Sequence, residues 1–131
     1  MDTKSKTTSN EEVLVDSEYK SLMFYNTTIR NVGLYTSVSI ALLGYASNLK
    51  APSMRLTALF FLLSSLAFLV VAIMLNYNLY TTMKRIEVET PAQKEELDPW
   101  VRICTMIFPI HFVILVMISG YVLFNIQNGV K

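Results

Sequence analysis

The sequence predicts an all-α integral membrane protein with three transmembrane helices and a short N-terminal tail. The 131-residue chain is 53% hydrophobic and only 16% charged, against about 25% charged residues in soluble domains. Its charges leave three long uncharged runs, at residues 31–49, 56–83 and 103–130. An uncharged apolar run of about 18 residues or more is a transmembrane candidate, because ~20 helical residues cross the hydrocarbon core of a bilayer.

The residues before the first uncharged run divide into a polar tail and an amphipathic segment. Residues 1–17 are rich in Ser, Thr, Lys and Glu and lack apolar periodicity, which predicts a mobile tail that a partner would order. Residues 18–30 place apolar side chains at helical spacing. We therefore expect an amphipathic helix that either lies along the membrane surface or continues into the first span as one long helix.

The first span, residues 31–49, contains more small and polar residues than the other two. Gly33, Ser37, Ala41 and Gly44 recur along one face of the expected helix. Helices in lipid associate through close backbone approach and interhelical hydrogen bonds, and small residues permit both. We expect these four residues to form a helix-packing face, whose partner is the second span, the third span or a neighbouring chain.

The second span, residues 56–82, is apolar on all sides, as expected of a helix within a membrane. Only Lys50–Met54 separates it from the first span, and so short a connection predicts an antiparallel neighbouring pair. Tyr77 and Tyr80 near its end fit the aromatic belt at the membrane–water interface.

Residues 83–99 form the main polar loop. Thr90 followed by Pro91 resembles a helix cap with proline at the first helical position, which predicts one short helix in the loop. Asp98 and Pro99 repeat this signal and predict the start of the third helix. We place the third span at residues 100–127, with Trp100 as a further residue of the membrane interface.

The distribution of Lys and Arg near the span ends predicts the orientation. The N-terminal side and the polar loop together carry eight: Lys4, Lys6, Lys20, Arg30, Lys84, Arg85, Lys94 and Arg102. The opposite side carries Lys50, Arg55 and Lys131. We expect the N-terminus and the 83–99 loop on the positive side of the membrane, which is the cytoplasmic side in a cell.

Residues with catalytic or ligand-binding chemistry are few, and we expect no enzyme. His111, the only histidine, lies within the third span, where an ionisable residue is a functional candidate. Cys104 lies two turns earlier, but two donors do not complete a metal site. The residues therefore predict a neutral His111 that hydrogen-bonds a neighbouring helix, with no metal and no cofactor. The net charge of +1 gives no basis for binding nucleic acid.

The stretch RNVGLYTSVSIALLGYA opens the first span. It resembles a pattern in small membrane proteins of large icosahedral DNA viruses, the algal-virus, mimivirus-like and iridovirus-like group. The pattern reads RN, apolar, x, L, x, T-S, apolar, small, and then A-L-G-Y. The likeness covers residues 30–45, about an eighth of the chain. It implies a virion component, with no catalytic residue, held in the internal membrane beneath an icosahedral shell.

These observations lead to a structural expectation: a membrane-embedded minor capsid protein that links a viral internal membrane to its shell. Its partners would be the lipid bilayer and other membrane or capsid proteins, contacted through the N-terminal tail and the loop 86–99. A small accessory or assembly subunit of a cellular or organellar membrane complex is the alternative. A pore former is a third. The sequence leaves a homo-oligomer and a hetero-oligomer equally open.

Overall fold

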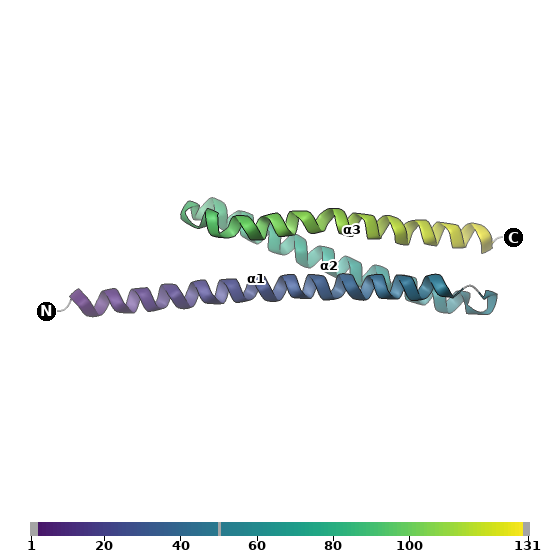
Figure 1. The fold of residues 1–131 in the computed structure, drawn as a ribbon, viewed down its shortest axis with the longest axis horizontal. Coiled ribbons are helices and arrows are strands. Elements are labelled where there is room, and N and C mark those ends of the chain that lie inside the picture. The colour runs from purple at the N-terminus through teal and green to yellow at the C-terminus, as the bar shows by residue number, and fades with distance from the viewer. Residues whose placement is uncertain (1–2, 50, 130–131) are drawn as a thin grey trace.

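The computed structural model describes the backbone of residues 3–49 and 51–129, and the side chains of residues 20–49, 51 and 53–124. Three long helices follow one another: α1 (Thr3–Asn48), α2 (Arg55–Glu89) and α3 (Lys94–Gly129). Short 3-10 helices, η1 (Pro52–Met54) and η2 (Pro91–Gln93), lie at the two connections. Figure 1 shows an elongated bundle in which α2 runs antiparallel to both α1 and α3. The all-α prediction is confirmed.

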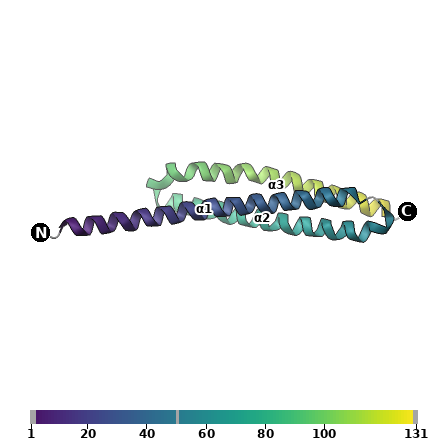
Figure 2. The same ribbon diagram turned by 60° about the horizontal axis from the view of Figure 1, so that its bottom comes forward.

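The helix α1 is longer than the two helices that it packs against. Its 46 residues span about 69 Å at the rise of an α-helix. In Figures 1 and 2 its N-terminal part extends beyond the η2 end of the α2–α3 pair. The sequence predicted an irregular tail over residues 1–17, whereas α1 already begins at Thr3. Residues 3–17 contain no Gly or Pro, so a helix nucleated in the bundle extends outward at little cost.

The predicted boundaries around the second connection need one correction. The short helix expected at Thr90–Pro91 is present, because η2 begins at Pro91 with Thr90 as its N-cap residue. The predicted helix start at Asp98–Pro99 is wrong, because α3 begins at Lys94 and encloses Pro99. The carbonyl that Pro99 cannot bond belongs to Glu95, an exposed residue in the first turn of α3. Water can satisfy that carbonyl, so the proline costs little there.

A buried residue recurs every seven positions in all three helices. In α1 this series is Tyr25, Val32, Ser39 and Ala46, with Leu43 also buried; in α3 it is Leu97, Cys104, His111 and Ile118, with Val101 and Ile114 also buried. In α2 the buried series runs Ala58, Leu62, Ser65, Leu69, Ala72, Asn76, Leu79 and Met83, with spacings that alternate between four and three. This 3.5-residue period is that of a left-handed coiled coil, so each helix buries a narrow stripe and leaves the remainder of its surface outside.

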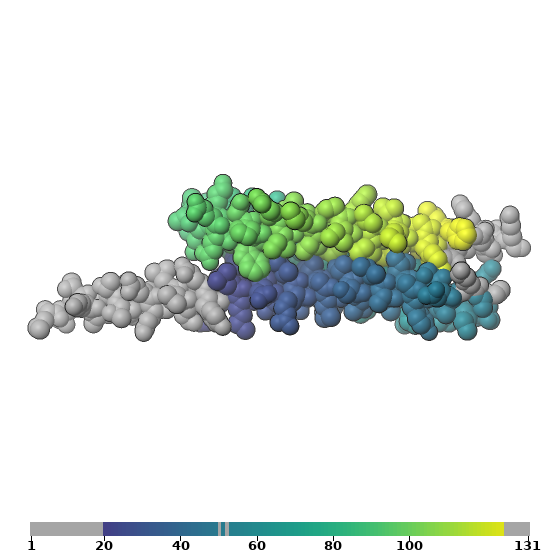
Figure 3. Space-filling model, in the orientation of Figure 1, coloured from purple at the N-terminus to yellow at the C-terminus, as the bar shows by residue number. Residues whose placement is uncertain are grey.

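Two apolar clusters occupy the two ends of this stripe. The η2-end core consists of Tyr25, Leu79, Met83, Leu97, Val101 and Cys104. The η1-half core consists of Leu43, Ala46, Leu62, Leu69, Ile114 and Ile118. Figure 3 shows the described side chains of α1 and α3 meeting on one face along the length that the two helices share. The bundle is therefore packed from end to end.

Candidate functional site: a buried polar seam and a charged end

A reciprocal hydrogen-bonded pair joins α1 to α2 at the middle of the bundle. The Ser39 hydroxyl donates to the Ser65 carbonyl at 2.8 Å, and the Ser65 hydroxyl donates to the Ser39 carbonyl at 2.7 Å. Both serines are completely buried. A hydroxyl reaches the backbone of a facing helix only when the two backbones lie close, which needs small residues on both sides. Because the two helices are antiparallel with Ser39 opposite Ser65, residues seven positions away also face each other. Ala46 lies toward Ala58, and Val32 lies toward Ala72.

A second polar contact joins α1 to α3. His111 Nε2 lies 2.9 Å from Thr36 Oγ1, and the Thr36 hydroxyl donates to the Val32 carbonyl at 2.7 Å. Because the single hydroxyl proton of Thr36 points to that carbonyl, Thr36 accepts a hydrogen bond from His111 Nε2. Buried Nδ1 has no hydrogen-bond partner among the described residues, so a neutral imidazole with its proton on Nε2 fits this geometry. The predicted role of His111 in bonding a neighbouring helix agrees with this geometry.

The remaining polar contacts complete the set of helix pairs. Asn76 Nδ2 donates to the Cys104 carbonyl at 3.0 Å and joins α2 to α3. The Tyr121 hydroxyl donates to the Ala46 carbonyl at 3.2 Å and joins α3 to α1 a second time. We name these contacts, with the serine pair and the His111–Thr36 contact, the polar seam. Each interhelical hydrogen bond in lipid contributes about 0.6 kcal/mol and at most about 1.7 kcal/mol. The seam therefore fixes register and partner choice more than it adds stability.

The predicted packing face of α1 lies on the outside of the bundle formed by the described residues. Gly33, Ser37, Ala41 and Gly44 are all exposed. A Cβ atom added at either glycine would meet nothing within 4 Å. The second and third spans are thus not the partners of this face in the structure. Packing against a neighbouring chain stays a prediction.

The predicted interface aromatics gather near the η2 end. Tyr80 and Trp100 both pack against the η2-end core, and the Tyr80 ring lies edge-on to Phe108 at 6.0 Å. Trp100 lies 6.3 Å from the ring of Tyr25. Tyr77 is more than half exposed, one helical turn before Tyr80. The three aromatics therefore lie together at the boundary between the apolar stretch of the bundle and its charged end.

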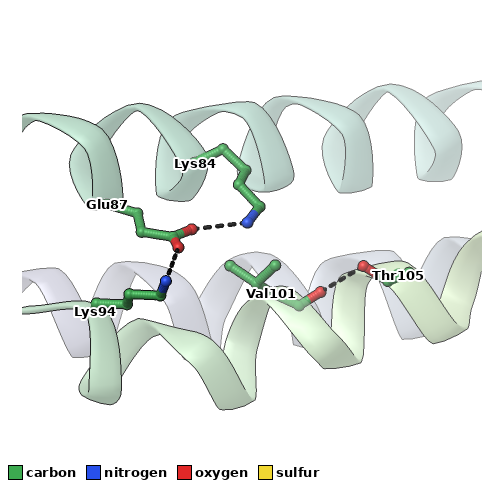
Figure 4. Close-up of polar contacts among 5 residues, drawn as sticks. All are labelled: Lys84, Glu87, Lys94, Val101 and Thr105. Atoms are coloured by element: carbon green, nitrogen blue, oxygen red, sulfur yellow. Dashed lines mark hydrogen bonds and ion pairs between the residues drawn. The ribbon is translucent and has the colours of Figure 1, made fainter. Parts of the chain in front are cut away.

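Ion pairs tie α2 to the start of α3 at this end (Figure 4). Glu87 accepts a hydrogen bond from Lys84 at 2.7 Å and lies 3.5 Å from Lys94 Nζ, across the connection. The hydrogen bond between Lys84 and Glu87 lowers the pKa of Glu87 and raises the pKa of Lys84. Figure 4 also shows the Thr105 hydroxyl bonded to the Val101 carbonyl within α3. Glu87 thus connects a helix end to the helix that follows it.

A cavity of about 70 Å³ opens beside these ion pairs. Its lining comes from α1, α2, η2 and α3 and consists of Ser21, Leu22, Tyr25, Ile86, Gln93, Glu96, Leu97 and Trp100. Burial first, and then the negative charge of Glu96, raise the pKa of Tyr25. The Glu96 carboxylate therefore lies close enough to the Tyr25 hydroxyl to act on it electrostatically.

No family model, curated protein or solved structure matches the chain. Its function has to be argued from its own geometry. Sequence reasoning missed Ser39, Ser65 and Asn76 as interhelical contacts, and it missed the cavity. One signal for the seam was present, because Ala58, Ser65 and Ala72 recur every seven residues within the apolar part of α2. Among the described residues no group of three metal-ligating side chains occurs.

Proposed function

We propose that this chain is a structural membrane protein that crosses a bilayer three times and presents its η2 end to a protein partner. The supporting observation is the large apolar surface that covers the outside of the bundle. Apolar residues fill the space between the helices, with a few hydrogen-bonded polar ones among them, and yet further large apolar side chains such as Phe60, Phe112 and Phe124 are each more than 60% exposed. Two helices, α2 and α3, are long and apolar enough to cross a membrane, and only 28% and 17% of their most apolar parts are buried.

The third crossing is argued from the pairing of α1 with α2. The serine contact ties α1 to Ser65, which lies within the most apolar stretch of α2. If α2 crosses the bilayer and keeps this contact, α1 must cross beside it. The residues between Arg30 and Lys50 carry no charge. As a helix they would extend about 30 Å, which is the thickness of the hydrocarbon core.

Sidedness follows from the same arrangement. The part of α1 around Tyr25, the end of α2 and the beginning of α3 meet at the η2 end. The cations of this end are Lys84, Arg85, Lys94 and Arg102. In this proposal the η2 end and the extension of α1 lie on the positive side. They supply the surface through which the chain contacts a shell or another membrane protein.

The setting we propose is a virion in which the chain links an internal membrane to an icosahedral capsid. Support comes from the likeness of residues 30–45 to small viral membrane proteins and from the projecting α1, which is long enough to reach beyond the headgroups. Mass spectrometry of purified particles tests it. We expect the chain at a copy number tied to capsid symmetry. Absence from particles, with recovery in a fixed cellular membrane complex, would favour the accessory-subunit alternative.

Cysteine labelling tests the three crossings. Single cysteines at Thr8, Ser53 and Gln93, with Cys104 replaced by alanine, are exposed to a membrane-impermeant maleimide in sealed vesicles. We expect positions 8 and 93 to label from one side and position 53 from the other. If positions 8 and 53 labelled from the same side, α1 would lie outside the hydrocarbon core and the three-span proposal would be wrong.

A further inference from the structure

We propose that the cavity at the η2 end binds the quaternary ammonium group of a choline headgroup. This deepens the proposed function, because a choline lipid in the bilayer would be the natural source of that group. The same chemistry also occurs in free phosphocholine, and the experiment below distinguishes the two sources.

The lining has the composition of a cation site. Two aromatic rings, Tyr25 and Trp100, contribute to its wall at a centroid distance of 6.3 Å. Aromatic faces attract cations, and aromatic cages are a recurring way to recognise choline and methylated ammonium groups. Glu96 is the charged residue of the lining and adds a negative charge to the aromatic pair.

The surrounding ion pairs leave Glu96 available. Lys84 and Lys94 both pair with Glu87, and Arg85 lies 4.0 Å from Glu89. Within the described part of the chain, no cation forms an ion pair with Glu96. The carboxylate is exposed, so a ligand can approach it from solvent or from the headgroup layer. The cavity thus keeps an uncompensated negative charge at its mouth.

The lining also selects among cations. Leu22, Ile86 and Leu97 supply apolar walls beside the polar side chains of the lining. A primary ammonium would gain nothing from these apolar walls, because it carries no methyl groups to bury against them. A trimethylammonium group has no N–H donors and buries methyl groups against these walls. A choline group therefore fits this lining better than an ethanolamine group.

The location fits a lipid headgroup. Trp100 and Tyr80 belong to the aromatic boundary beside the η2-end core, and such aromatics sit at headgroup level in membranes. The cavity opens next to this boundary, on the charged side. A lipid whose acyl chains lie against the apolar surface of α2 and α3 could place its headgroup in this cavity.

The test uses the only tryptophan as its reporter. Trp100 lines the cavity and is the single Trp of the chain. The full chain in maltoside micelles, which carry no choline, is titrated with phosphocholine, tetramethylammonium and phosphoethanolamine while Trp100 emission is recorded. We expect a saturable change with the first two ligands and a much weaker response to phosphoethanolamine. No saturable response to tetramethylammonium would overturn the proposal.

Two glutamates one residue apart provide the matched variants. Glu96 lines the cavity and Glu95 does not, and both are exposed. We expect Glu96→Gln to weaken binding about three- to tenfold and Glu95→Gln to leave it unchanged, with equal helix content by circular dichroism. Equal effects of the two substitutions would show a general charge effect and refute the site.

The source of the ligand is read in nanodiscs. In phosphatidylcholine discs the lipid headgroup should already occupy the cavity, so we expect no change in Trp100 emission on adding phosphocholine. In phosphatidylglycerol discs, which carry no choline, we expect the change. A response in both discs would identify free phosphocholine as the ligand and remove the lipid from the proposal. Micelle binding does not depend on the number of crossings. Failure of the labelling experiment and failure of this one are therefore distinguishable.

Discussion

The two ends of the bundle have similar apolar cores but different surroundings. The η2-end core is filled by large side chains such as Tyr25, Leu79 and Met83, and ion pairs centred on Glu87 lie outside it. In the middle and η1 half, large side chains such as Leu62 and Leu69 also fill the core, but Ser39 contacts Ser65 beside them, and the outside carries large apolar side chains. The first arrangement suits water as the surrounding solvent.

The second arrangement suits lipid. Large apolar side chains gain little by leaving lipid for a helix interface, so interfaces in membranes rely on close backbones and hydrogen bonds. In water the same side chains gain most by being buried. In the three-span proposal, the change from one pattern to the other within continuous helices marks where the bundle passes from membrane to water. This comparison predicts that the same type of substitution changes the stability of the bundle by different amounts in its two halves, and on the buried and exposed faces of one helix.

The largest expected effect is at the serine contact. Ser39→Leu inserts a large side chain where the backbones of α1 and α2 lie close together, and it removes the hydrogen bond that the Ser39 hydroxyl donates to the Ser65 carbonyl. We expect a loss of about 3 kcal/mol in the free energy of unfolding, measured by denaturant titration in mixed micelles. Ser37→Leu is the control, because Ser37 is exposed and bonds only within its own helix. Its change should stay within about 0.5 kcal/mol; equal losses would mean that the seam is wrongly placed.

A smaller effect is expected at the contact between His111 and Thr36. A double-mutant cycle with His111→Phe and Thr36→Val should give a coupling energy of about 0.6 kcal/mol, with about 1.7 kcal/mol as the upper bound. The control cycle combines His111→Phe with Thr28→Val. Thr28 is exposed, and its hydroxyl donates to the Phe24 carbonyl in its own helix. That cycle should give zero coupling. Zero coupling in both would argue against the contact.

The ion pairs at the η2 end should contribute least, and with a defined pH dependence. The hydrogen bond from Lys84 holds the folded-state pKa of Glu87 below its ordinary value of 4.5. Stability from this carboxylate is therefore present above that value and lost as the pH falls through the folded-state pKa. We expect Glu87→Gln to lower the melting temperature slightly at pH 7 but not at strongly acid pH. Glu89→Gln, at the more distant Arg85 contact, should change it less; a difference that persisted in strong acid would contradict this assignment.

No effect on the isolated bundle is expected on the exposed face of α1. Gly33→Leu combined with Ala41→Leu meets open space and should leave the free energy of unfolding unchanged. If this face packs against a neighbouring chain, the double variant should lower the yield of chemically crosslinked assemblies. Gly120→Leu on α3, which also meets open space, is the control. Unchanged crosslinking yields for both variants would exclude the face as an interchain contact.

Some of this architecture follows from the sequence without a structure. Charge-free runs predicted the helices, and the short first connection predicted that α1 and α2 are antiparallel neighbours. Thr90 and Pro91 predicted η2. These features are local, because they depend on residues close in sequence, on helix length and on the preference of charges for water. The predicted function of His111 as a helix contact was also within reach, since a lone buried imidazole needs a hydrogen-bond partner.

The packing face required the tertiary structure. The first span carries small or polar residues on two faces, with Gly33, Ser37 and Ala41 on one and Thr36, Ser39 and Ala46 on the other. Composition favoured the first face, whereas the bundle uses the second. The choice depends on Ser65, Ala58 and His111, which lie on other helices and far away in the sequence. Only their register against α1 decides which small residues bring two backbones together. The sequence therefore determined that α1 is a helix able to pack closely, and the tertiary structure decided which face does so.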